Sequence, residues 1–287
     1  MSNVPPELAR KLANGQVILF VGAGVSMSLK LPSYSALIRE IGGHLGFDGA
    51  IFEGFGDYLT LAEYYHLEKK GLQELQRHLQ AKWNVPERDV AASPVHRALV
   101  ELGCKSIYTT NFDSFLERAH RAMSRPYKRI LSVKDMVDVH HEAVQIVKLH
   151  GDLTVPSGMV FTESSYFERL SFESPLDVKL RADALGKSLL FIGYSLADIN
   201  IRYLMYRLQM QWEQEPEQEV RPKSYVFLTR PNAVQAEVLR SRGVEAIVGD
   251  GADPSASLAS FLNQLRTDAD GLKKEPLAGK SKRKKPT

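Results

Sequence analysis

Short apolar runs alternate along the chain with longer stretches in which apolar residues recur at helical spacing. Nearly continuous apolar runs of about four to eight residues are typical of strands buried on both faces of a parallel sheet. The predicted strands cover residues 16–21, 106–110, 144–149, 188–194, 224–229 and 244–248. The predicted helices cover residues 7–14, 112–123, 176–185, 199–212, 234–242 and 257–265. This alternation predicts an α/β protein with a doubly wound parallel sheet.

One long segment, at about 45–102, contains no apolar run that is typical of a strand. Within it, residues 57–70 and 72–83 have the spacing of amphipathic helices. We therefore predict a helical insertion at about 45–102, placed between the first two core strands. It is predicted to be part of the same domain and not an independent one.

The positive charge of the chain is concentrated at its end. The 37 Lys and Arg against 34 Asp and Glu give a formal net charge of +3, but residues 273–287 carry +6, which leaves −3 for residues 1–272. Because residues 269–287 have almost no apolar side chains, we predict one domain over 1–268 followed by a basic disordered tail. Such a tail can contact nucleic acid through phosphates, although we favour a solubilising role.

The chain has a single cysteine, Cys104. One thiol cannot form an internal disulfide or a structural zinc site with three or four cysteine ligands, so we expect a reducing, cytoplasmic setting and no metal. No apolar run approaches the roughly 18–20 residues of a membrane span, and the first residues lack the apolar core of a secretory signal. These features exclude secreted and integral-membrane proteins.

A glycine-rich turn follows the first predicted strand. Gly22, Ala23, Gly24 and Ser26 lie between that strand and a helix expected to begin near Ser33. Glycines let a backbone approach a pyrophosphate closely, and free N–H groups at such a turn can donate to it. The turn lacks both the third glycine of the dehydrogenase fingerprint and the Gly-Lys-Ser/Thr of a Walker motif. It predicts phosphate binding, with a tight turn that binds no ligand as the alternative.

Two polar residues directly follow predicted strands: Asn111 after strand 106–110, and His150 after strand 144–149. Ligands of open α/β sheets bind outside the carboxyl ends of the strands. An Asn amide can hold a water or a ribose hydroxyl, and a His can act as a general base. Helix capping by Asn111-Phe112-Asp113 and a structural histidine are the alternatives for each residue taken alone.

A third motif, from Gly193 to Asp198, ends the strand at 188–194 and begins a helix. Ser195 and Asp198 are good helix caps. A carboxylate at this place can also accept hydrogen bonds from ribose hydroxyls, as acidic residues of dinucleotide sites do.

In this order the motifs resemble those of the sirtuin superfamily, over roughly residues 16–248. Gly22–Ser26 is similar to the sirtuin Gly-Ala-Gly-x-Ser loop, and Tyr34 retains the aromatic of the Ile-Pro-Asp-Phe segment. Asn111 and Asp113 are retained from the Gln-Asn-Ile-Asp motif.

The later motifs extend the same resemblance. His150 and the glycine after it match the catalytic His-Gly pair, and Gly193 and Ser195 are retained from Gly-Thr-Ser-Leu. His96 stands in a segment that resembles a Pro-x-His scaffold motif, which implies a structural role. The resemblance implies a Rossmann-like sheet that binds NAD.

One difference from the sirtuin deacetylases reduces the number of functions that the resemblance allows. Sirtuin deacetylases carry a four-cysteine zinc module between the His-Gly and Gly-Thr-Ser motifs, whereas residues 151–188 contain no cysteine. The residues in these motifs resemble more closely those of the bacterial sirtuin-like NADases of antiphage defence. The resemblance implies hydrolysis of NAD⁺ to nicotinamide and ADP-ribose by a regulated, NAD-depleting effector.

The resemblance also implies roles for individual residues. The expected catalytic pair is Asn111 and His150. The residues expected to bind NAD are Gly22, Ala23, Gly24, Ser26, Tyr34, Asp113, Gly193, Ser195 and Asp198.

The resemblance further implies regulation by assembly: a homo-oligomer, or a HerA-type ATPase or Argonaute-type partner. The helical insertion and residues 199–219 are the candidate contact surfaces, although for the helix at 199–212 we favour a buried core helix. Two other functions stay open: an NAD or ADP-ribose binding subunit without turnover, and an NAD-dependent protein deacylase.

Overall fold

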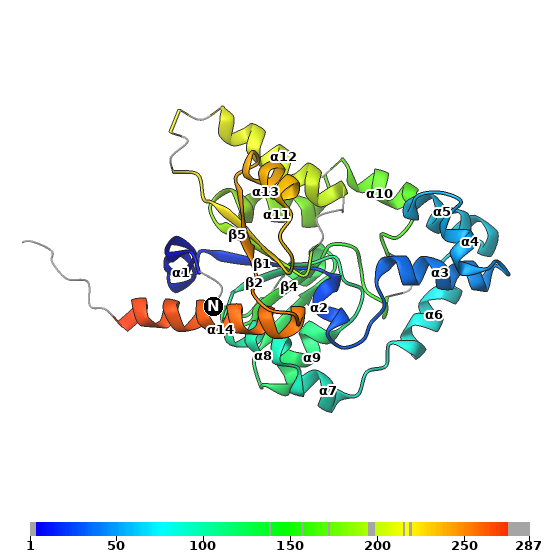
Figure 1. Ribbon diagram of the computed structural model, residues 1–287, viewed down its shortest axis with the longest axis horizontal. Helices are drawn as coiled ribbons and strands as arrows, with labels where there is room; N and C mark the ends of the chain where they lie inside the picture. Colours follow the sequence, from blue (N-terminus) through cyan, green and yellow to red (C-terminus); the bar gives the residue numbers. More distant parts are fainter. Residues whose placement is uncertain are drawn as a thin grey trace, which may run out of the picture.

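The computed structural model describes residues 4–137, 139–155, 158–171, 173–194, 199–214, 216–217 and 220–274. A seven-stranded, all-parallel sheet with the order β3-β4-β2-β1-β5-β6-β7 forms its centre (Figure 1). The strands are β1 (Val17–Val21), β2 (Ser106–Thr109), β3 (Tyr127–Ile130), β4 (Val144–Lys148), β5 (Ser188–Ile192), β6 (Ser224–Leu228) and β7 (Val244–Val248). The predicted α/β class and doubly wound parallel sheet are confirmed.

The strand β3 is the one element of the sheet that the sequence pattern did not predict. It lies at the sheet edge beside β4, and only its last residue is buried. Its sequence, Tyr-Lys-Arg-Ile, carries two charges in four residues, which a half-exposed edge strand tolerates and a central strand does not. The other six strands all occur where apolar runs predicted them.

Helices cover both faces of the sheet (Figure 1). On one face lie α1 (Pro6–Ala13), α8 (Pro94–Glu101), α9 (Phe115–Ala122) and α14 (Pro254–Lys274). On the other face lie α11 (Pro175–Leu185), α12 (Ile199–Glu213) and α13 (Ala233–Arg240). The remaining helices are α2 (Ala23–Met27), α3 (Tyr34–His44), α4 (Gly49–Glu53), α5 (Tyr58–Lys69), α6 (Gln73–Lys82), α7 (Glu87–Ala92), the 3₁₀ helix η1 (Val133–Met136) and α10 (Glu163–Arg169).

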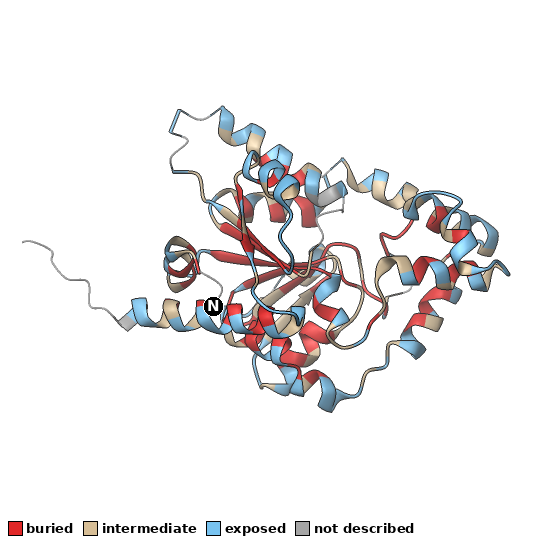
Figure 2. Cartoon of the chain, viewed as in Figure 1, coloured by how far each residue is buried: buried red, intermediate tan, exposed pale blue. Residues whose placement is uncertain are grey.

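The first strand shows why a central strand of this sheet needs a continuous run of apolar residues. Successive side chains of a strand point to opposite faces. In β1, Val17, Leu19 and Val21 pack into one hydrophobic cluster, whereas Ile18 and Phe20 pack into the cluster on the other face. All five are buried, and the central strands are accordingly coloured red in Figure 2. A polar residue on either face of this strand would lie in a dry environment.

The chain between β1 and β2 is helical, as predicted. Helices α3 to α6 extend away from the sheet and share their own apolar core, which also includes Leu153, Met159 and Phe161 from the segment after β4 (Figures 1 and 2). Within the predicted insertion, α8 behaves differently, because it contacts α14 against the sheet. The helical subdomain proper therefore consists of α3–α6.

The end of the domain lies beyond the predicted boundary at residue 268. The predicted helix at 257–265 is part of the longer α14, which continues to Lys274. Leu265 and Ala269, four residues apart, are both buried in the same cluster, so the apolar face continues past the predicted start of the tail. Residues 275–287 lie outside the described part of the chain.

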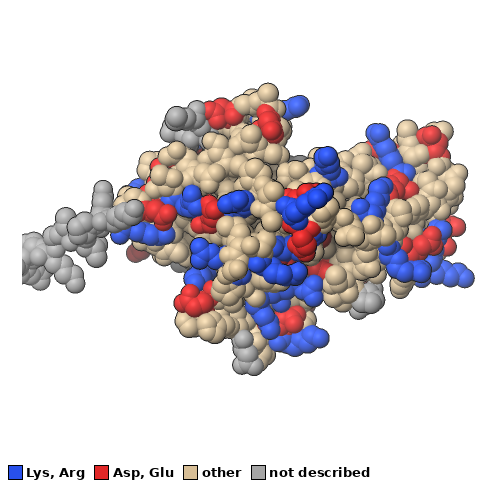
Figure 3. Space-filling model, turned by 90° about the horizontal axis from the view of Figure 1, so that it is seen from below, with Lys and Arg blue, Asp and Glu red and all other residues tan. Residues whose placement is uncertain are grey.

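Among the described residues, no helix combines the length and the apolar character needed to cross a membrane. Charged side chains of both signs are interspersed on the face seen in Figure 3, where Lys and Arg gather around the middle.

Candidate active site

The register of the sheet brings the predicted motifs together at one edge. Val21 of β1 pairs with Thr109 of β2 and Ile192 of β5, and Thr109 also pairs with Lys148 of β4. Gly22 and Gly193 are therefore each one residue beyond this row, while Asn111 and His150 are each two residues beyond it. Four segments far apart in the sequence meet at the carboxyl edge of four adjacent strands, where α/β proteins bind ligands.

The glycines of the first and fifth strands allow their two loops to touch. A Cβ on Gly22 would lie 2.5 Å from the carbonyl oxygen of Gly193, and a Cβ on Gly24 would lie 2.9 Å from the same atom. Gly193 has a φ of +66°, and its own Cβ would lie 2.6 Å from the nitrogen of Val25. The Gly24 N–H also donates to the Gly193 carbonyl at 2.9 Å. Close backbone packing therefore requires all three glycines, with or without a ligand.

The helix predicted near Ser33 is present, and a short helix that was not predicted precedes it. α2 starts at Ala23, inside the motif, and the helix expected near Ser33 is a separate one, α3, which Ser33 caps by accepting from the N–H of Ala36. Ala23 and Gly24 are exposed, whereas Ser26 is buried. The first turn of α2 therefore presents backbone to the surface at the sheet edge.

Asn111 is held by the glycine turn and the short helix that follow β1. Its Nδ2 donates to the carbonyl oxygen of Gly22 and to Oγ of Ser26, each at 3.1 Å. Ser26 Oγ in turn donates to Asp113 Oδ2 at 2.7 Å, and Asp113 Oδ1 accepts from the N–H of Phe115. The amide oxygen of Asn111 is buried and has no hydrogen-bond partner among the described residues. Such an oxygen is costly to leave unpaired, so it is a ready acceptor for a ligand hydroxyl or a water.

His150 is buried beneath α10. Its side chain is 2% exposed, and its ring packs edge-on against Tyr166 at a centroid distance of 5.1 Å. Burial, with a smaller contribution from the Arg169 cation, lowers the pKa of His150 to about 3. At neutral pH the imidazole is therefore uncharged, which is the form that can accept a proton. The next residue, Gly151, has a φ of +84°, and a Cβ there would lie 2.3 Å from the oxygen of Gly158.

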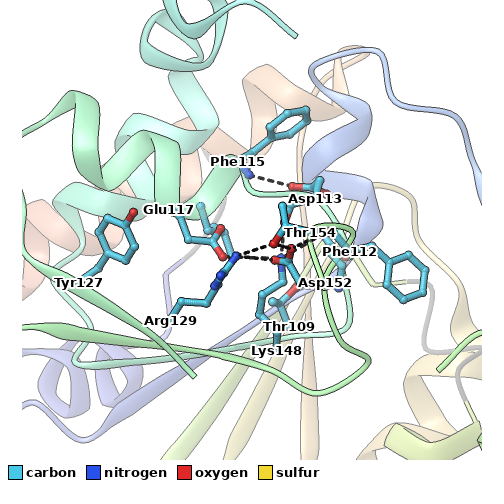
Figure 4. A network of polar contacts seen from close by, with 12 residues as sticks. Thr109, Phe112, Asp113, Phe115, Glu117, Tyr127, Arg129, Lys148, Asp152 and Thr154 are labelled. Atoms are coloured by element: carbon cyan, nitrogen blue, oxygen red, sulfur yellow. Dashed lines mark hydrogen bonds and ion pairs between the residues drawn. The ribbon is translucent and has the colours of Figure 1, made fainter. Parts of the chain in front are cut away.

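A buried lysine ties the loop that carries Asn111 to strand β4 (Figure 4). The ammonium of Lys148 donates to the carbonyl oxygens of Phe112 and Asp113. It also forms ion pairs with Asp152, at 2.6 Å, and with Glu117 of α9, at 3.6 Å. The side chain of Lys148 is 0% exposed. A charge removed from water in this way needs all of these partners, so the loop position and the ion pairs depend on one another.

The two carboxylates beside Lys148 differ in their pKa. Burial raises the pKa of Glu117 and outweighs the opposing effect of Lys148. For Asp152, burial also raises the pKa, but Lys148 and the hydrogen bonds from Thr154 outweigh it, so the net pKa is lowered. Arg129 of β3 adds a second cation at 3.3 Å from Asp152. Asp152 is the carboxylate that carries the charge, and Glu117 is the one that resists ionisation.

The remaining predicted residues fall into three groups. Tyr34 packs against Tyr58 and Phe161, with ring centroids 5.6 and 5.7 Å away, so it belongs to the wall between the site and the helical subdomain. His96 is buried and hydrogen-bonded to Ser93 at 2.8 Å, consistent with the predicted structural role. Ser195 and Asp198 lie outside the described residues.

Sequence reasoning missed the Lys148 network, although a signal for it was present. A lysine in a strand that is otherwise apolar has to be paired, because lysine is almost never buried without a partner. Asp152, four residues later, is that partner. Sequence reasoning also missed the contact between Thr110 Oγ1 and the Tyr194 hydroxyl, at 2.8 Å, which joins the ends of β2 and β5.

Two hollows among the described residues lie away from this edge. One, of about 440 Å³, lies between α5 and α6 and residues 158–168. The other, of about 810 Å³, is lined by the end of α12 and by residues near Gly186. Neither Asn111 nor His150 lines them. Asn111 and His150 are both buried in this structure.

Comparison with known proteins finds both a family and individual relatives. Residues 105–247 match the family described as SIR2-like domain. The chain is 28% identical over 212 residues to the NAD(+) hydrolase ThsA of Bacillus cereus (strain MSX-D12), covering 73% of this chain and 43% of that protein. The NAD(+) hydrolase ThsA of Acinetobacter baumannii (strain 532279) is 26% identical over 214 residues, covering 74% and 43%.

A third relative, Defense-associated sirtuin 2 of Bacillus subtilis, is 24% identical over 242 residues, which is 81% of this chain and 23% of that protein. The chain thus spans less than half the length of these three relatives.

The close approach of the two glycine loops predicts a difference between two glycines of the same backbone conformation. Gly193 and Gly15 have φ of +66° and +68°, but a Cβ on Gly15 would meet nothing within 4 Å. Gly15→Ala is expected to lower the free energy of unfolding by about 1–2 kcal/mol, from backbone strain alone. Gly193→Ala is expected to lower it by roughly 1–3 kcal/mol more, from the added overlap. Urea unfolding followed by circular dichroism measures both, and equal losses would contradict the required close approach.

The raised pKa of Glu117 predicts a pH-dependent stability. Above the ordinary pKa of 4.5 the unfolded chain releases this proton while the folded chain retains it, so stability falls as pH rises through the folded pKa. Glu117→Gln removes this effect. The unfolding free energy of the wild type, relative to the variant, is therefore expected to decrease as pH rises from 4.5.

Urea unfolding over a pH series measures this difference. The same substitution at the exposed Glu237 serves as control. A difference between wild type and Glu117→Gln that stays constant with pH, or grows as pH rises, would show that Glu117 is ionised as readily in the folded chain as in the unfolded one.

Proposed function

We propose that this chain, whose residues 105–247 match the family described as SIR2-like domain, hydrolyses NAD⁺ to nicotinamide and ADP-ribose. Because the chain spans less than half of each ThsA relative, the proposal rests on the site as well as on the similarity. The observation that carries it is the amide oxygen of Asn111, which is fixed in place, buried, and without a partner among the described residues.

The proposed reaction breaks the bond between the nicotinamide nitrogen and C1′ of the ribose, and forms a bond from C1′ to a water oxygen. Nicotinamide leaves as a neutral molecule from a cationic substrate, so little acid assistance is needed. The site must position the ribose and the water, and accept one proton from the water. Asn111 is proposed to hold the water or a ribose hydroxyl through its amide oxygen.

His150 is proposed to accept the proton. The imidazole is uncharged at neutral pH, which is the form that accepts a proton, whereas a pKa of about 3 makes His150 a weak base as long as it stays buried. The register supports it as well, since His150 and Asn111 lie at equivalent positions beyond adjacent strands.

The other predicted residues are proposed to serve in two ways. Exposed backbone at Ala23 and Gly24 is available to the pyrophosphate, with Gly22 and Gly193 required for the shape of the loops. The contacts of Ser26 and Asp113 support a positioning role, because both side chains are engaged in holding Asn111. Tyr34 is proposed to form part of the wall of the site, and Ser195 and Asp198 to contact the adenosine end.

The burial of the two proposed catalytic residues supports regulation. Asn111 is 8% exposed and His150 is 2% exposed, so NAD⁺ reaches them only if covering elements move. Tyr166 of α10 packs directly on His150, which makes α10 the element proposed to move. An NAD-depleting enzyme of antiphage defence needs such a restraint. Homo-oligomerisation and a HerA-type ATPase or Argonaute-type partner stay predictions.

Hydrolysis is favoured over the two alternatives. A protein deacylase of the sirtuin type uses a four-cysteine zinc module, and the only cysteine here, Cys104, is buried with a pKa raised to about 12 by burial. A binding subunit without turnover would have no use for an uncharged histidine at the end of the strand adjacent to that of Asn111. Intact NAD⁺ recovered after long incubation would favour the binding subunit.

Loss of either proposed catalytic residue is expected to abolish turnover. Asn111→Ala and His150→Ala are each expected to slow nicotinamide release by about 100-fold or more, since positioned acid–base groups contribute roughly 10²–10⁴ in rate. Chromatography of nicotinamide released from NAD⁺ by the purified full chain measures this. His141→Ala, an 80% exposed histidine, is the control and should retain full activity. Full turnover by either site variant would refute the assigned roles.

The pH profile provides a separate expectation for His150. Because its pKa is lowered to about 3, the base form is present throughout the range in which an ordinary histidine titrates. We expect kcat/KM for NAD⁺, which reports the free enzyme, to show no acid limb near pH 6.5. An acid limb at that pH would mean that His150 is solvated before substrate binds.

A further inference from the structure

Three side chains of types that can ligate metals lie close together between α3 and α6. They belong to the helical subdomain and lie away from the carboxyl edge of the sheet. Glu40 and His44 lie four residues apart on α3, and His78 comes from α6. One ligand atom from each lies within 4.8 Å of the other two. The rings of His44 and His78 are perpendicular, with centroids 4.4 Å apart, and Nε2 of His78 contacts Oε1 of Glu40.

One of these groups has no partner. Nδ1 of His44 is buried, and no described residue forms a hydrogen bond with it. Because an unpaired buried nitrogen is costly, a ligand at this position would remove a penalty that the fold otherwise carries. The perpendicular rings and the nearby carboxylate are a suitable arrangement for a cation that binds nitrogen.

We propose that Glu40, His44 and His78 bind a divalent transition-metal ion, with zinc the best match, and that the ion clamps α3 to α6. Two imidazoles and one carboxylate are a ligand set that zinc accepts, with a water in the fourth position. Magnesium and calcium prefer oxygen ligands and do not fit. In a tetrahedral site with bonds of about 2.0–2.1 Å, ligand atoms are about 3.4 Å apart, so small side-chain rotations suffice.

A lysine competes for the same carboxylate. Nζ of Lys82 lies 2.6 Å from Oε1 of Glu40, on a side chain that is 52% exposed. It neutralises Glu40 when no metal is bound, and its exposure lets it swing into solvent when a metal arrives. This competition lowers the metal affinity without removing the site.

A metal ion that joins α3 to α6 would also affect the segment after β4, because α6 forms hydrogen bonds with that segment. On α6, Nε2 of Gln76 donates to the carbonyl of Val155 at 3.0 Å, and Gln80 donates to the carbonyl of Leu153. Both acceptors belong to the segment that follows His150. A metal that fixes α6 against α3 therefore also stabilises this segment, whether or not the chain hydrolyses NAD⁺.

Metal titration of the untagged full chain, after treatment with a chelator, tests the proposal. Visible absorption of Co²⁺ is the probe, and Zn²⁺ is the competitor. The wild type is expected to bind one equivalent, and Zn²⁺ to displace Co²⁺. His44→Ala and His78→Ala are each expected to weaken binding by at least about 10-fold. Lys82→Ala is expected to strengthen it, because the competing cation is gone.

The matched control is His141→Ala, which removes a histidine that also lies beside another histidine and a glutamate. It should leave the affinity unchanged. Absence of stoichiometric binding by the wild type would overturn the proposal, as would a loss of binding in His141→Ala with none in His44→Ala.

Thermal unfolding provides a second measurement that does not depend on the folding of the histidine variants. Zn²⁺ is expected to raise the Tm of the wild type, and to raise that of Lys82→Ala at a lower concentration. A Tm that does not respond to Zn²⁺ in either protein would equally overturn the proposal.

Discussion

The buried ammonium of Lys148 is the interaction on which the candidate site depends. It joins the end of β4 to the loop after β2 by donating to two backbone carbonyls and pairing with two carboxylates. Those carbonyls belong to Phe112 and Asp113, the residues immediately after Asn111. The position of the asparagine is therefore set by a charge that cannot be solvated, which is a stronger restraint than a surface loop normally has.

A second restraint acts from the other side of the site. The loops after β1 and β5 approach so closely that neither tolerates a Cβ at Gly22, Gly24 or Gly193. Asn111 donates to Gly22 and Ser26, so the rigid glycine loop and the lysine-held loop converge on one amide. What the amide lacks is a partner for its oxygen among the described residues. A site built in this way is ordered before any ligand arrives, which favours catalysis by positioning. The same packing buries His150 beneath α10, so a substrate reaches this ordered site only after α10 moves.

Much of the fold could be predicted because its signals are local. The central strands are buried on both faces, and this forces apolar runs such as Val17–Val21. The edge strand Tyr127–Ile130 was not predicted, because a half-exposed strand does not need a continuous apolar run. Helix α14 was predicted too short because its last buried residue, Ala269, stands among polar neighbours. For the site, Asn111 and His150 were identifiable from their places at strand ends. The expectation of no metal was drawn from the single cysteine, which excludes cysteine-rich sites but does not bear on Glu40, His44 and His78.

The sequence by itself determined the parallel sheet apart from its edge strand β3, the order of the motifs along the chain and the chemical types of the candidate catalytic residues. These signals are local, because an apolar run or a short motif involves only a few neighbouring residues. Only the tertiary structure decided what each of those residues contacts. It assigned Gly22 and Gly193 to loop packing, Ser26 and Asp113 to holding Asn111, and Lys148 to fixing the loop that carries Asn111. These roles depend on pairs such as Lys148 and Glu117, which come from different elements, and distances between such residues are set by the register of the sheet and the packing of its helices. No local pattern encodes them.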